Sequence, residues 1–126
     1  MALLAFDHVN LRTTRLEEMK EWYATVLGLH TGERPDFPFP GAWLYLGERA
    51  VVHLIGVSEA DTPTPRLTLE HFAFRANDYK GFKQRLDDRG IPYRVGQVPG
   101  LPIVQVNVND PDGNHIHIDF EIAAGP

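Results

Sequence analysis

The sequence contains no cysteine among its 126 residues. Disulfide bonds and thiolate metal sites are therefore excluded, and we expect a protein of a reducing compartment, the cytoplasm. No apolar run approaches the roughly 20 residues that a membrane-spanning helix requires. The start, Met1–Phe6, has no basic region and meets Asp7 too early for a signal peptide. We therefore expect no membrane partner.

Positive charge is also scarce in this chain. Twelve Lys and Arg stand against 17 Asp and Glu, which gives a net charge of −5 and leaves no basic stripe for a nucleic acid. The hydrophobic fraction of 43% and the charged fraction of 23% are those of a globular protein. The length suits one soluble domain with its own core. Composition says nothing about chemistry.

The first half of the chain follows the order strand, helix, strands. A strand is predicted over 6–12. Thr14 has Glu17 three residues later, which is the spacing of a capping box at the start of a helix. Gly28 is the predicted end of that helix. Its apolar residues recur at helical spacing: Leu16, Met19, Trp22, Tyr23, Val26 and Leu27.

Two further strands complete this half. They are predicted over 42–46 and 50–55, joined as a hairpin by Gly47, Glu48 and Arg49. A Pro-rich loop precedes them, and the polar segment of about 58–66, with two prolines, is a predicted linker.

The same order then begins again. A strand over 69–75 is followed by a helix that Asn77 or Asp78 caps and Gly90 ends, with Tyr79, Phe82 and Leu86 as its apolar residues. The last elements are strands over 91–95, 103–108 and 115–121, the final one after the turn 110–114.

The spacing of four histidines supports a repeat. His71 follows His8 by 63 residues, and His117 follows His53 by 64. Self-similarity at a nearly fixed offset indicates two copies of one supersecondary unit. Each copy then has one histidine on its first strand and one on its last. We expect these four histidines to meet around one axis.

Neutral imidazole is a common ligand of zinc, iron, nickel and copper, and zinc needs its donors at about 2.0–2.1 Å. No local spacing brings ligands together here, so only the fold can do so. The linked set predicts a shared metal site: His8, His53, His71 and His117. His30 is interpreted as a loop residue and His115 as an exposed residue at a strand edge.

The strands that carry these histidines also supply polar and aromatic residues as candidates for a substrate pocket: Arg12, Trp43, Tyr45, Arg75, Gln105 and Asn107. For the aromatic pair, packing in the core is the alternative, and for the two arginines a solvated surface. The segment 37–39, Phe-Pro-Phe, is either a lid over the pocket or a plain Pro-rich loop.

At this point the chain resembles the vicinal oxygen chelate superfamily, which includes glyoxalase I, extradiol dioxygenases and bleomycin and fosfomycin resistance proteins. The resemblance covers nearly the whole chain and rests on the order and spacing of several short motifs. They are Asp7-His8-Val9, Tyr23 with Leu27-Gly28-Leu29, Val51–Leu54, Glu70–Phe74, Gly90-Ile91 and Asp110–Asn114.

The resemblance implies an α+β fold. Two βαβββ modules would form a half-open β barrel around a divalent metal ion, with the helices outside. The chain would be one domain over 1–126, with module 1 at about 1–57, the linker at about 58–66 and module 2 at about 67–126. A homodimer is expected, in which pockets in some members combine modules from both chains.

The resemblance also assigns ligands. His8 and His71 match the two first-strand histidines, and His53 stands where glyoxalase-like members carry a carboxylate. His117 stands where most metal-binding members have a glutamate. Imidazole in place of carboxylate raises the charge of the site by one and removes the carboxylate that glyoxalase-type catalysis uses as a base.

The last predicted strand also carries two acidic residues on the side of His117. Asp119, two residues further on, is predicted to orient its imidazole. Glu121 lies about 13 Å along the strand from His117 and is too far away to replace it as a ligand.

The leading hypothesis is a metal-dependent lyase, isomerase or dioxygenase. It would bind a small substrate with adjacent oxygens to Fe²⁺, Zn²⁺, Ni²⁺ or Mn²⁺ and polarise it, or activate dioxygen where the metal is iron. His53 would be a fourth ligand or the catalytic base. The competing hypothesis is a metal-free binding module of the drug-sequestering kind. A purely structural or regulatory role has no supporting feature beyond the expected dimer.

Overall fold

The computed structural model describes residues 1, 4–58, 69, 71–97 and 101–122. It divides the chain into two compact units, Met1–Pro65 and Arg66–Pro126. Each unit has one helix and a four-stranded sheet in the order strand, helix, strand, strand, strand. The prediction of two βαβββ modules is therefore confirmed. The predicted linker lies, apart from Ser58, outside the described residues. None of the described helices is long and apolar enough to cross a membrane.

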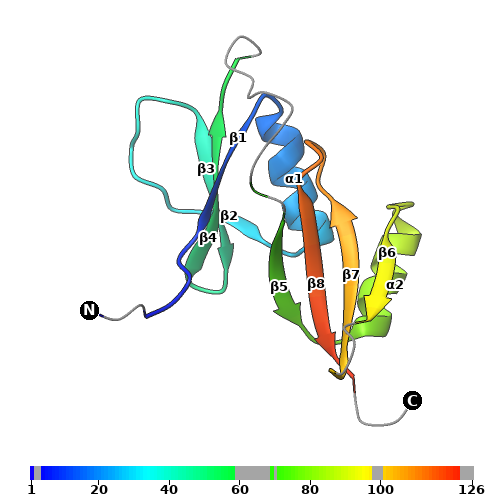
Figure 1. Cartoon of the computed structure of the whole chain (residues 1–126). Coiled ribbons are helices and arrows are strands. Elements are labelled where there is room, and N and C mark those ends of the chain that lie inside the picture. The colour runs from blue at the N-terminus through cyan, green and yellow to red at the C-terminus, as the bar shows by residue number, and fades with distance from the viewer. Residues whose placement is uncertain (2–3, 59–68, 70, 98–100, 123–126) are drawn as a thin grey trace. The chain divides into compact units, whose positions relative to one another are not determined.

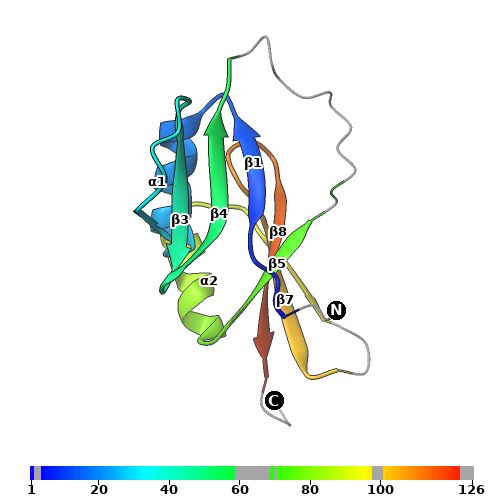
Figure 2. The same ribbon diagram turned by 90° about the vertical axis from the view of Figure 1, so that its left-hand side faces the viewer.

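The sheet of the first unit has the strand order β1-β4-β3-β2, with β1 parallel to β4 and the other pairs antiparallel. Figure 2 shows β1, β4 and β3 as neighbours. Its elements are β1 Val9–Thr13, α1 Leu16–Val26, β2 His30–Gly32, β3 Gly41–Leu46 and β4 Arg49–Gly56. The short strand β2 was not predicted, and His30 is its first residue rather than a loop residue. It has no apolar alternation because all three of its residues are exposed.

Helix α1 begins differently from the prediction. The prediction of a capping box at Thr14 is wrong, because Arg15 occupies the N-cap position and no side chain caps the helix. The Thr13 hydroxyl instead accepts a hydrogen bond from the Arg15 backbone N–H at 2.9 Å. Gly28, with φ of +77°, ends the helix as predicted.

The core of the first unit lies between α1 and one face of the sheet. Met19, Tyr23 and Val26 of the helix are buried there. Alternate strand residues meet them, as strand geometry requires: Leu11, Ala42, Leu44, Val52 and Leu54. The other face of the same strands remains for polar and aromatic side chains.

The second unit repeats this plan with the strand order β5-β8-β7-β6 (Figure 1). Its elements are β5 Phe72–Ala76, α2 Tyr79–Asp88, β6 Arg94–Gln97, β7 Ile103–Asn109 and β8 His115–Glu121. Strand β5 is parallel to β8, and the remaining pairs are antiparallel. The predicted apolar faces of β7 and β8 are buried: Val104, Val106, Val108, Ile116, Ile118 and Phe120.

Helix α2 has both predicted ends. Asp78 is in the left-handed region, with φ of 64°, and its carboxylate accepts the Gly81 N–H at 3.1 Å. Gly90, with φ of +64°, follows the last turn. Phe82 and Leu86 are buried against the sheet. This helix therefore covers the apolar face and leaves the histidine-bearing face of β8 uncovered by it.

A buried carboxylate shapes the turn that leads into β8. Asp110 is only 4% exposed, and its Oδ1 accepts the backbone N–H groups of Asp112 at 3.0 Å and Asn114 at 2.9 Å. Its Oδ2 accepts the Asn114 side-chain amide at 2.8 Å. Gly113 takes φ of +86° in the same turn. The turn thus sets where β8, and with it His115, begins.

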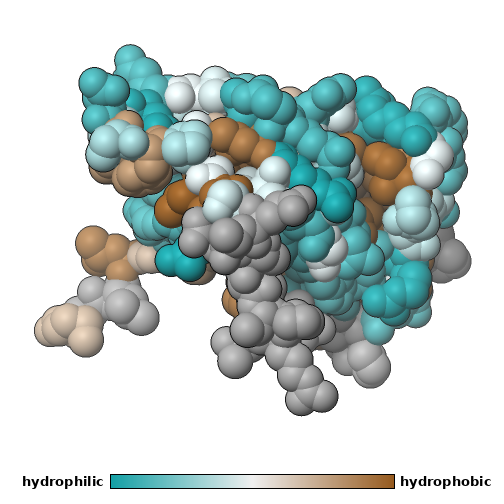
Figure 3. All heavy atoms as spheres, turned by 90° about the horizontal axis from the view of Figure 1, so that it is seen from above, coloured by the Kyte–Doolittle hydropathy of each residue, from teal (hydrophilic) through white to brown (hydrophobic). Residues whose placement is uncertain are grey.

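Hydrophobic side chains also reach the surface. Phe37, Phe39, Leu46 and Val95 are between 39% and 52% exposed. In the view of Figure 3, the hydrophobic residues form separate patches among hydrophilic ones. Scattered exposed hydrophobic residues are ordinary in a globular protein and identify no site by themselves.

Candidate functional site

The sheet of the second unit gathers polar side chains on the face opposite its core. In the strand register, His117 on β8 lies beside Ala73 of β5 and Asn107 of β7. Asp119 lies beside Gln105 in the same way. The sequence prediction that these groups share one face is therefore consistent with the register.

His117 is the most enclosed of the predicted ligands, at 9% exposure. Its Nδ1 lies 2.6 Å from Oδ1 of Asp119. A carboxylate accepts hydrogen bonds, so Nδ1 carries the proton and Nε2 carries the lone pair. The predicted orientation of His117 by Asp119 is present in the structure. A carboxylate behind an imidazole is the usual arrangement around metal-binding histidines.

Two further histidine rings lie close to His117. The ring centres of His71 and His117 are 4.5 Å apart, and those of His71 and His115 are 5.5 Å apart. The prediction of His115 as an exposed edge residue is wrong, because it is half-buried. Its Nε2 donates to Oδ1 of Asn107 at 2.8 Å. That hydrogen bond reaches across from β7, so the sequence of β8 alone could not reveal it.

The first unit pairs the other two predicted ligands in a different way. The ring of His53 lies between two others, with Trp43 at 4.1 Å and 11° on one side and His8 at 3.8 Å and 9° on the other. The Nε2 of His53 donates to the Ala50 carbonyl at 3.1 Å, which places its lone pair on Nδ1. Trp43 and Tyr45 are half-buried on this face, so their interpretation as core residues is wrong.

Burial is the main influence on the charge of His53. It lowers the pKa of His53 below the ordinary value of 6.5, and the charge of His8 lowers it further. The Ala50 carbonyl and Asp7 act in the opposite direction. The hydrogen bond from His8 Nδ1, at 2.7 Å, is the main reason that the pKa of Asp7 is lowered. His53 is therefore neutral at pH 7 and able to act as a donor or base.

A cleft of about 340 Å³ adjoins this stack of rings, and it is large enough for a small molecule. Its lining combines aromatic, acidic and basic side chains: Asp7, Trp43, Tyr45, Glu48, Arg49, Ala50 and His53. The wall of this cleft therefore includes the predicted ligand His53 and two predicted pocket residues, Trp43 and Tyr45.

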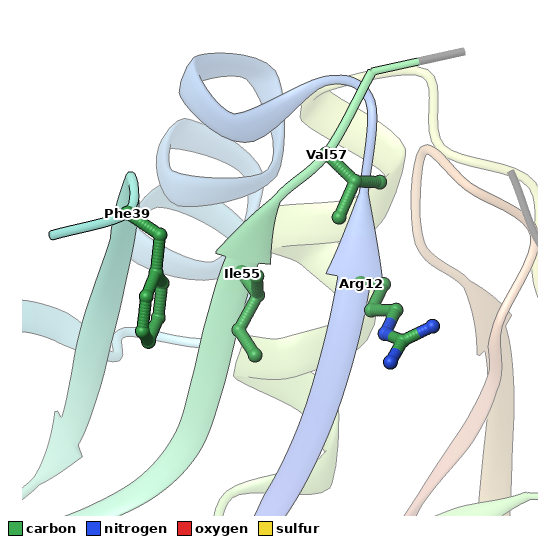
Figure 4. A pocket seen from close by; sticks show the side chains of 4 residues that line it. All are labelled: Arg12, Phe39, Ile55 and Val57. Carbon is green, nitrogen blue, oxygen red and sulfur yellow. The ribbon is translucent and has the colours of Figure 1, made fainter. Parts of the chain in front are cut away.

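A second cleft of about 310 Å³ lies on the same unit and is lined by Arg12, Phe39, Ile55 and Val57 (Figure 4). Phe39 belongs to the segment predicted as a lid or loop. The guanidinium of Arg34 lies 5.0 Å from the ring centre of Phe37 and 5.1 Å from that of Phe39. It also donates to the Phe39 carbonyl at 3.0 Å. Arg34 thus anchors this segment, and its role as a lid stays a prediction.

Among the other pocket candidates, Arg75 forms an ion pair with Glu121 at 3.3 Å, in which both side chains are more than 70% exposed. Such exposed pairs stabilise a fold by at most about 1 kcal/mol. The alternative interpretation of Arg75 as a solvated surface residue fits this geometry. Gln105 and Asn107 are half-buried on the histidine face.

Comparison with known proteins assigns the family. The sequence profile of the Glyoxalase/Bleomycin resistance protein/Dioxygenase superfamily matches residues 5–118. The chain belongs to this superfamily. No curated protein matches it in sequence. The resemblance derived from the motifs is thereby confirmed.

Solved structures of superfamily proteins share its fold. A Bacillus anthracis protein assigned to the glyoxalase family is 25% identical, with a TM-score of 0.78 over 97% of this chain and 98% of that one. Lactoylglutathione lyase from Agrobacterium tumefaciens is 23% identical, with a TM-score of 0.70 over 92% of each chain. A glyoxylase/bleomycin resistance protein/dioxygenase domain from Frankia sp. EAN1pec is 17% identical, with a TM-score of 0.78 over 98% and 96%.

The superfamily includes metal-dependent members, so the histidines can be tested as ligands. Their chemistry fits, since His53 and His117 have defined lone pairs. The geometry of the first unit does not fit as it stands. A metal ion lies in the plane of each imidazole that binds it, and stacked parallel rings such as His8 and His53 have no such common point. In the described part of the chain, no three His, Asp or Glu side chains already form a group that could hold a metal ion.

The four predicted ligands are therefore divided into two pairs. His8 and His53 belong to the first unit, and His71 and His117 belong to the second. Each pair has a carboxylate beside one ring, Asp7 at His8 and Asp119 at His117, but only the rings of the second pair are not parallel, with 42° between their planes. The convergence of all four on one ion stays a prediction.

Proposed function

We propose that this superfamily member is a metal-dependent enzyme that acts on a small substrate with adjacent oxygens. The main support for this proposal is the hydrogen-bonded pair of His117 and Asp119, which lies beside His71 on the polar face of the second unit's sheet. The carboxylate of Asp119 fixes the orientation and the tautomer of the His117 imidazole. Such an imidazole is suited to bind a metal ion because its tautomer is already set.

The chain's own residues have separate tasks in this proposal. His117 and His71 hold the cation, and Asp119 fixes the ring of His117. His53, neutral at pH 7, is the catalytic base or a further ligand. A divalent cation would supply Lewis acidity toward the two substrate oxygens. Trp43 and Tyr45 form part of the wall of the cleft beside His53 in the first unit.

Metal analysis of protein purified without an affinity tag tests the proposal. We expect about one equivalent of Zn²⁺, Ni²⁺, Mn²⁺ or Fe²⁺ per chain, either as purified or after addition. Neutral imidazole side chains bind such ions when the fold holds them together. Less than about a tenth of an equivalent, with no uptake of any of the four, would refute metal dependence. His117→Ala should lose the metal. His30→Ala is the matched control, because His30 is an exposed strand residue outside both pairs.

A second candidate is metal-free binding of a planar or cationic small molecule. The observation that favours it is the stack of Trp43, His53 and His8 beside a cleft that also contains Asp7 and Glu48. Aromatic faces and carboxylates together attract cations. If the protein takes up no metal, and an added planar cation quenches the fluorescence of Trp43, the results would support this candidate over the metal-dependent enzyme.

A further inference from the structure

The second cleft of the first unit combines an apolar lining with one positive charge. Its lining residues are Arg12, Phe39, Ile55 and Val57, and its volume is about 310 Å³. In Figure 4, the Phe39 ring and the Arg12 guanidinium lie at opposite ends of this row, with Ile55 and Val57 between them. The volume is at the small end of the roughly 300–1,000 Å³ typical of ligand pockets, so the cleft suits a small organic molecule.

Strand register directs Arg12 and Ile55 away from the core. Arg12 is exposed between buried Leu11 and Thr13 on β1, because successive strand residues point to opposite faces. Its partner in the parallel pairing with β4 is Ile55, so the two side chains are neighbours on one face. Val57 follows β4, and its N–H donates to the Thr13 carbonyl at 2.8 Å. The pairing of β1 with β4 therefore positions three of the four lining residues.

The Phe39 ring is held in place by the segment before β3. Arg34 donates to the Phe39 carbonyl at 3.0 Å, and its guanidinium lies 5.1 Å from the Phe39 ring centre. The rings of Phe37 and Phe39 are stacked, with their centres 5.0 Å apart and 10° between their planes. A Cβ atom at Gly41 would lie 2.8 Å from the Arg34 guanidinium, so the glycine leaves room for this contact. A ligand that packs against Phe39 therefore meets a wall that is already ordered, which favours binding.

The charge of Arg12 has no partner in the part of the chain that the structure describes. Its side chain forms no ion pair or hydrogen bond there, whereas Arg15 pairs with Glu18 and Arg75 with Glu121. A guanidinium presents a planar fork of N–H donors that matches the two oxygens of a carboxylate. Arg12 is the one charged residue among the four that line the cleft, so a single negative charge complements it.

We propose that this cleft binds a small organic carboxylate with an aromatic body. The carboxylate pairs with Arg12, and the body lies over Ile55 and Val57 against the Phe39 ring, in the offset or edge-on packing that aromatic rings favour. The site goes beyond the proposed function, because its binding uses neither a metal ion nor either histidine pair. It is compatible with the metal-dependent enzyme and with the metal-free binding protein.

Titration of the full, isotope-labelled chain with phenylacetate tests the site. Proton–nitrogen correlation NMR follows the backbone amides of Ile55 and Val57 and the Nε–H of Arg12, with no metal added. A probe of about ten non-hydrogen atoms should shift these signals with a Kd of about 1 mM. Phenylacetamide has the same size without the charge, and acetate lacks the aromatic body. Each should bind at least about 10-fold more weakly than phenylacetate.

Two substitutions separate the contribution of the charge from that of the ring. Arg12→Gln should weaken phenylacetate binding by about 10-fold and change phenylacetamide binding by less than about 2-fold, because only the carboxylate uses the guanidinium. Phe39→Ala should weaken phenylacetate binding by about 5-fold through the loss of the aromatic wall. Arg94→Gln is the matched control, because Arg94 is an exposed arginine on β6 of the second unit.

Three results would overturn the inference. They are no shift at these signals up to about 20 mM phenylacetate, equal phenylacetate affinity in the wild-type chain and Arg12→Gln, and phenylacetamide binding as tight as that of phenylacetate. The last comparison needs no substitution, so it also decides the case in which a variant does not fold. A chain that binds Zn²⁺ but not phenylacetate refutes this site alone. A chain that binds phenylacetate but none of the tested metals refutes the proposed metal-dependent enzyme alone.

Discussion

The turn before β8 is held by one carboxylate, and its removal can be given a magnitude. Asp110 accepts three hydrogen bonds, from the backbone N–H groups of Asp112 and Asn114 and from the side-chain amide of Asn114. A hydrogen bond to a charged group contributes about 1.5–3 kcal/mol. The three share one side chain and are not additive, and water can reach the exposed Asp112 after truncation. We therefore expect Asp110→Ala to lower the free energy of unfolding by about 3 kcal/mol.

Urea unfolding followed by far-ultraviolet circular dichroism measures this loss. With an m value of about 1.5 kcal/mol/M, a loss of 3 kcal/mol moves the midpoint down by about 2 M urea. Asp110→Asn keeps one oxygen for the two backbone donors but places an amide against the Asn114 amide, so its loss should be about half as large. Asp36→Ala, at an exposed loop position, is the control and should change stability by less than about 0.5 kcal/mol.

A loss below about 1 kcal/mol in Asp110→Ala would refute the reasoning, because it is smaller than the contribution of even one hydrogen bond to a charged group. It would mean that the backbone of the turn holds its shape without the carboxylate. A midpoint shift equal to that of Asp36→Ala would lead to the same conclusion.

Two further predictions concern the packing and the ionisation of the second unit. Phe120 is 1% exposed, with its ring centre 5.6 Å from that of Tyr79 and 5.8 Å from that of Phe82, so Phe120→Ala should lower the free energy of unfolding by about 3–5 kcal/mol in the same urea assay. A loss under about 1 kcal/mol would show that this ring is not part of the core. Tyr93 donates its hydroxyl to Asp87 at 2.9 Å, which raises the pKa of Tyr93 above 10.0. The folded-state pKa lies above the unfolded value, so this bond contributes stability below pH 10 that is lost as the pH rises through the folded pKa. NMR of the labelled tyrosine ring should show Asp87→Asn returning this pKa toward 10.0, and an unchanged titration would contradict the assignment.

Features that depend on local periodicity could be predicted from the sequence. The alternation along 115–121 predicts which residues of β8 enter the core, and it also places Asp119 on the side of His117. Gly28 and Gly90 both have a positive φ, a backbone conformation that residues with a Cβ atom rarely adopt. This explains why glycines mark the ends of the two helices. These properties are decided within a few residues of the chain.

Features that depend on neighbouring strands could not be predicted in this way. The burial of His115 comes from Asn107 and His71, which belong to other parts of the second unit. Strand β2 is recognisable only through its pairing with β3, because its three residues are all exposed. The stack of His8, His53 and Trp43 likewise brings together residue 8, which precedes β1, and residues of β4 and β3. Sequence alternation assigns a side chain to a face, and cross-strand register decides what it touches there.

The resemblance to the superfamily implies that His117 replaces a glutamate ligand, and in the proposed metal site this exchange would change the charge around the ion. An imidazole ligand adds no negative charge, so a divalent ion held by histidines alone keeps its full charge. Asp119 places one negative charge at 2.6 Å from the Nδ1 of His117, whereas the other ring nitrogen, Nε2, is the one that would bind the proposed metal ion. Such a carboxylate raises the basicity of the ligand without occupying a coordination position. In the proposed metal site, the negative charge would therefore belong to the group behind the ligand, and the ligand itself would be a neutral donor. Asp119→Asn keeps an oxygen for the hydrogen bond but removes this charge, so metal affinity in that variant separates charge from orientation.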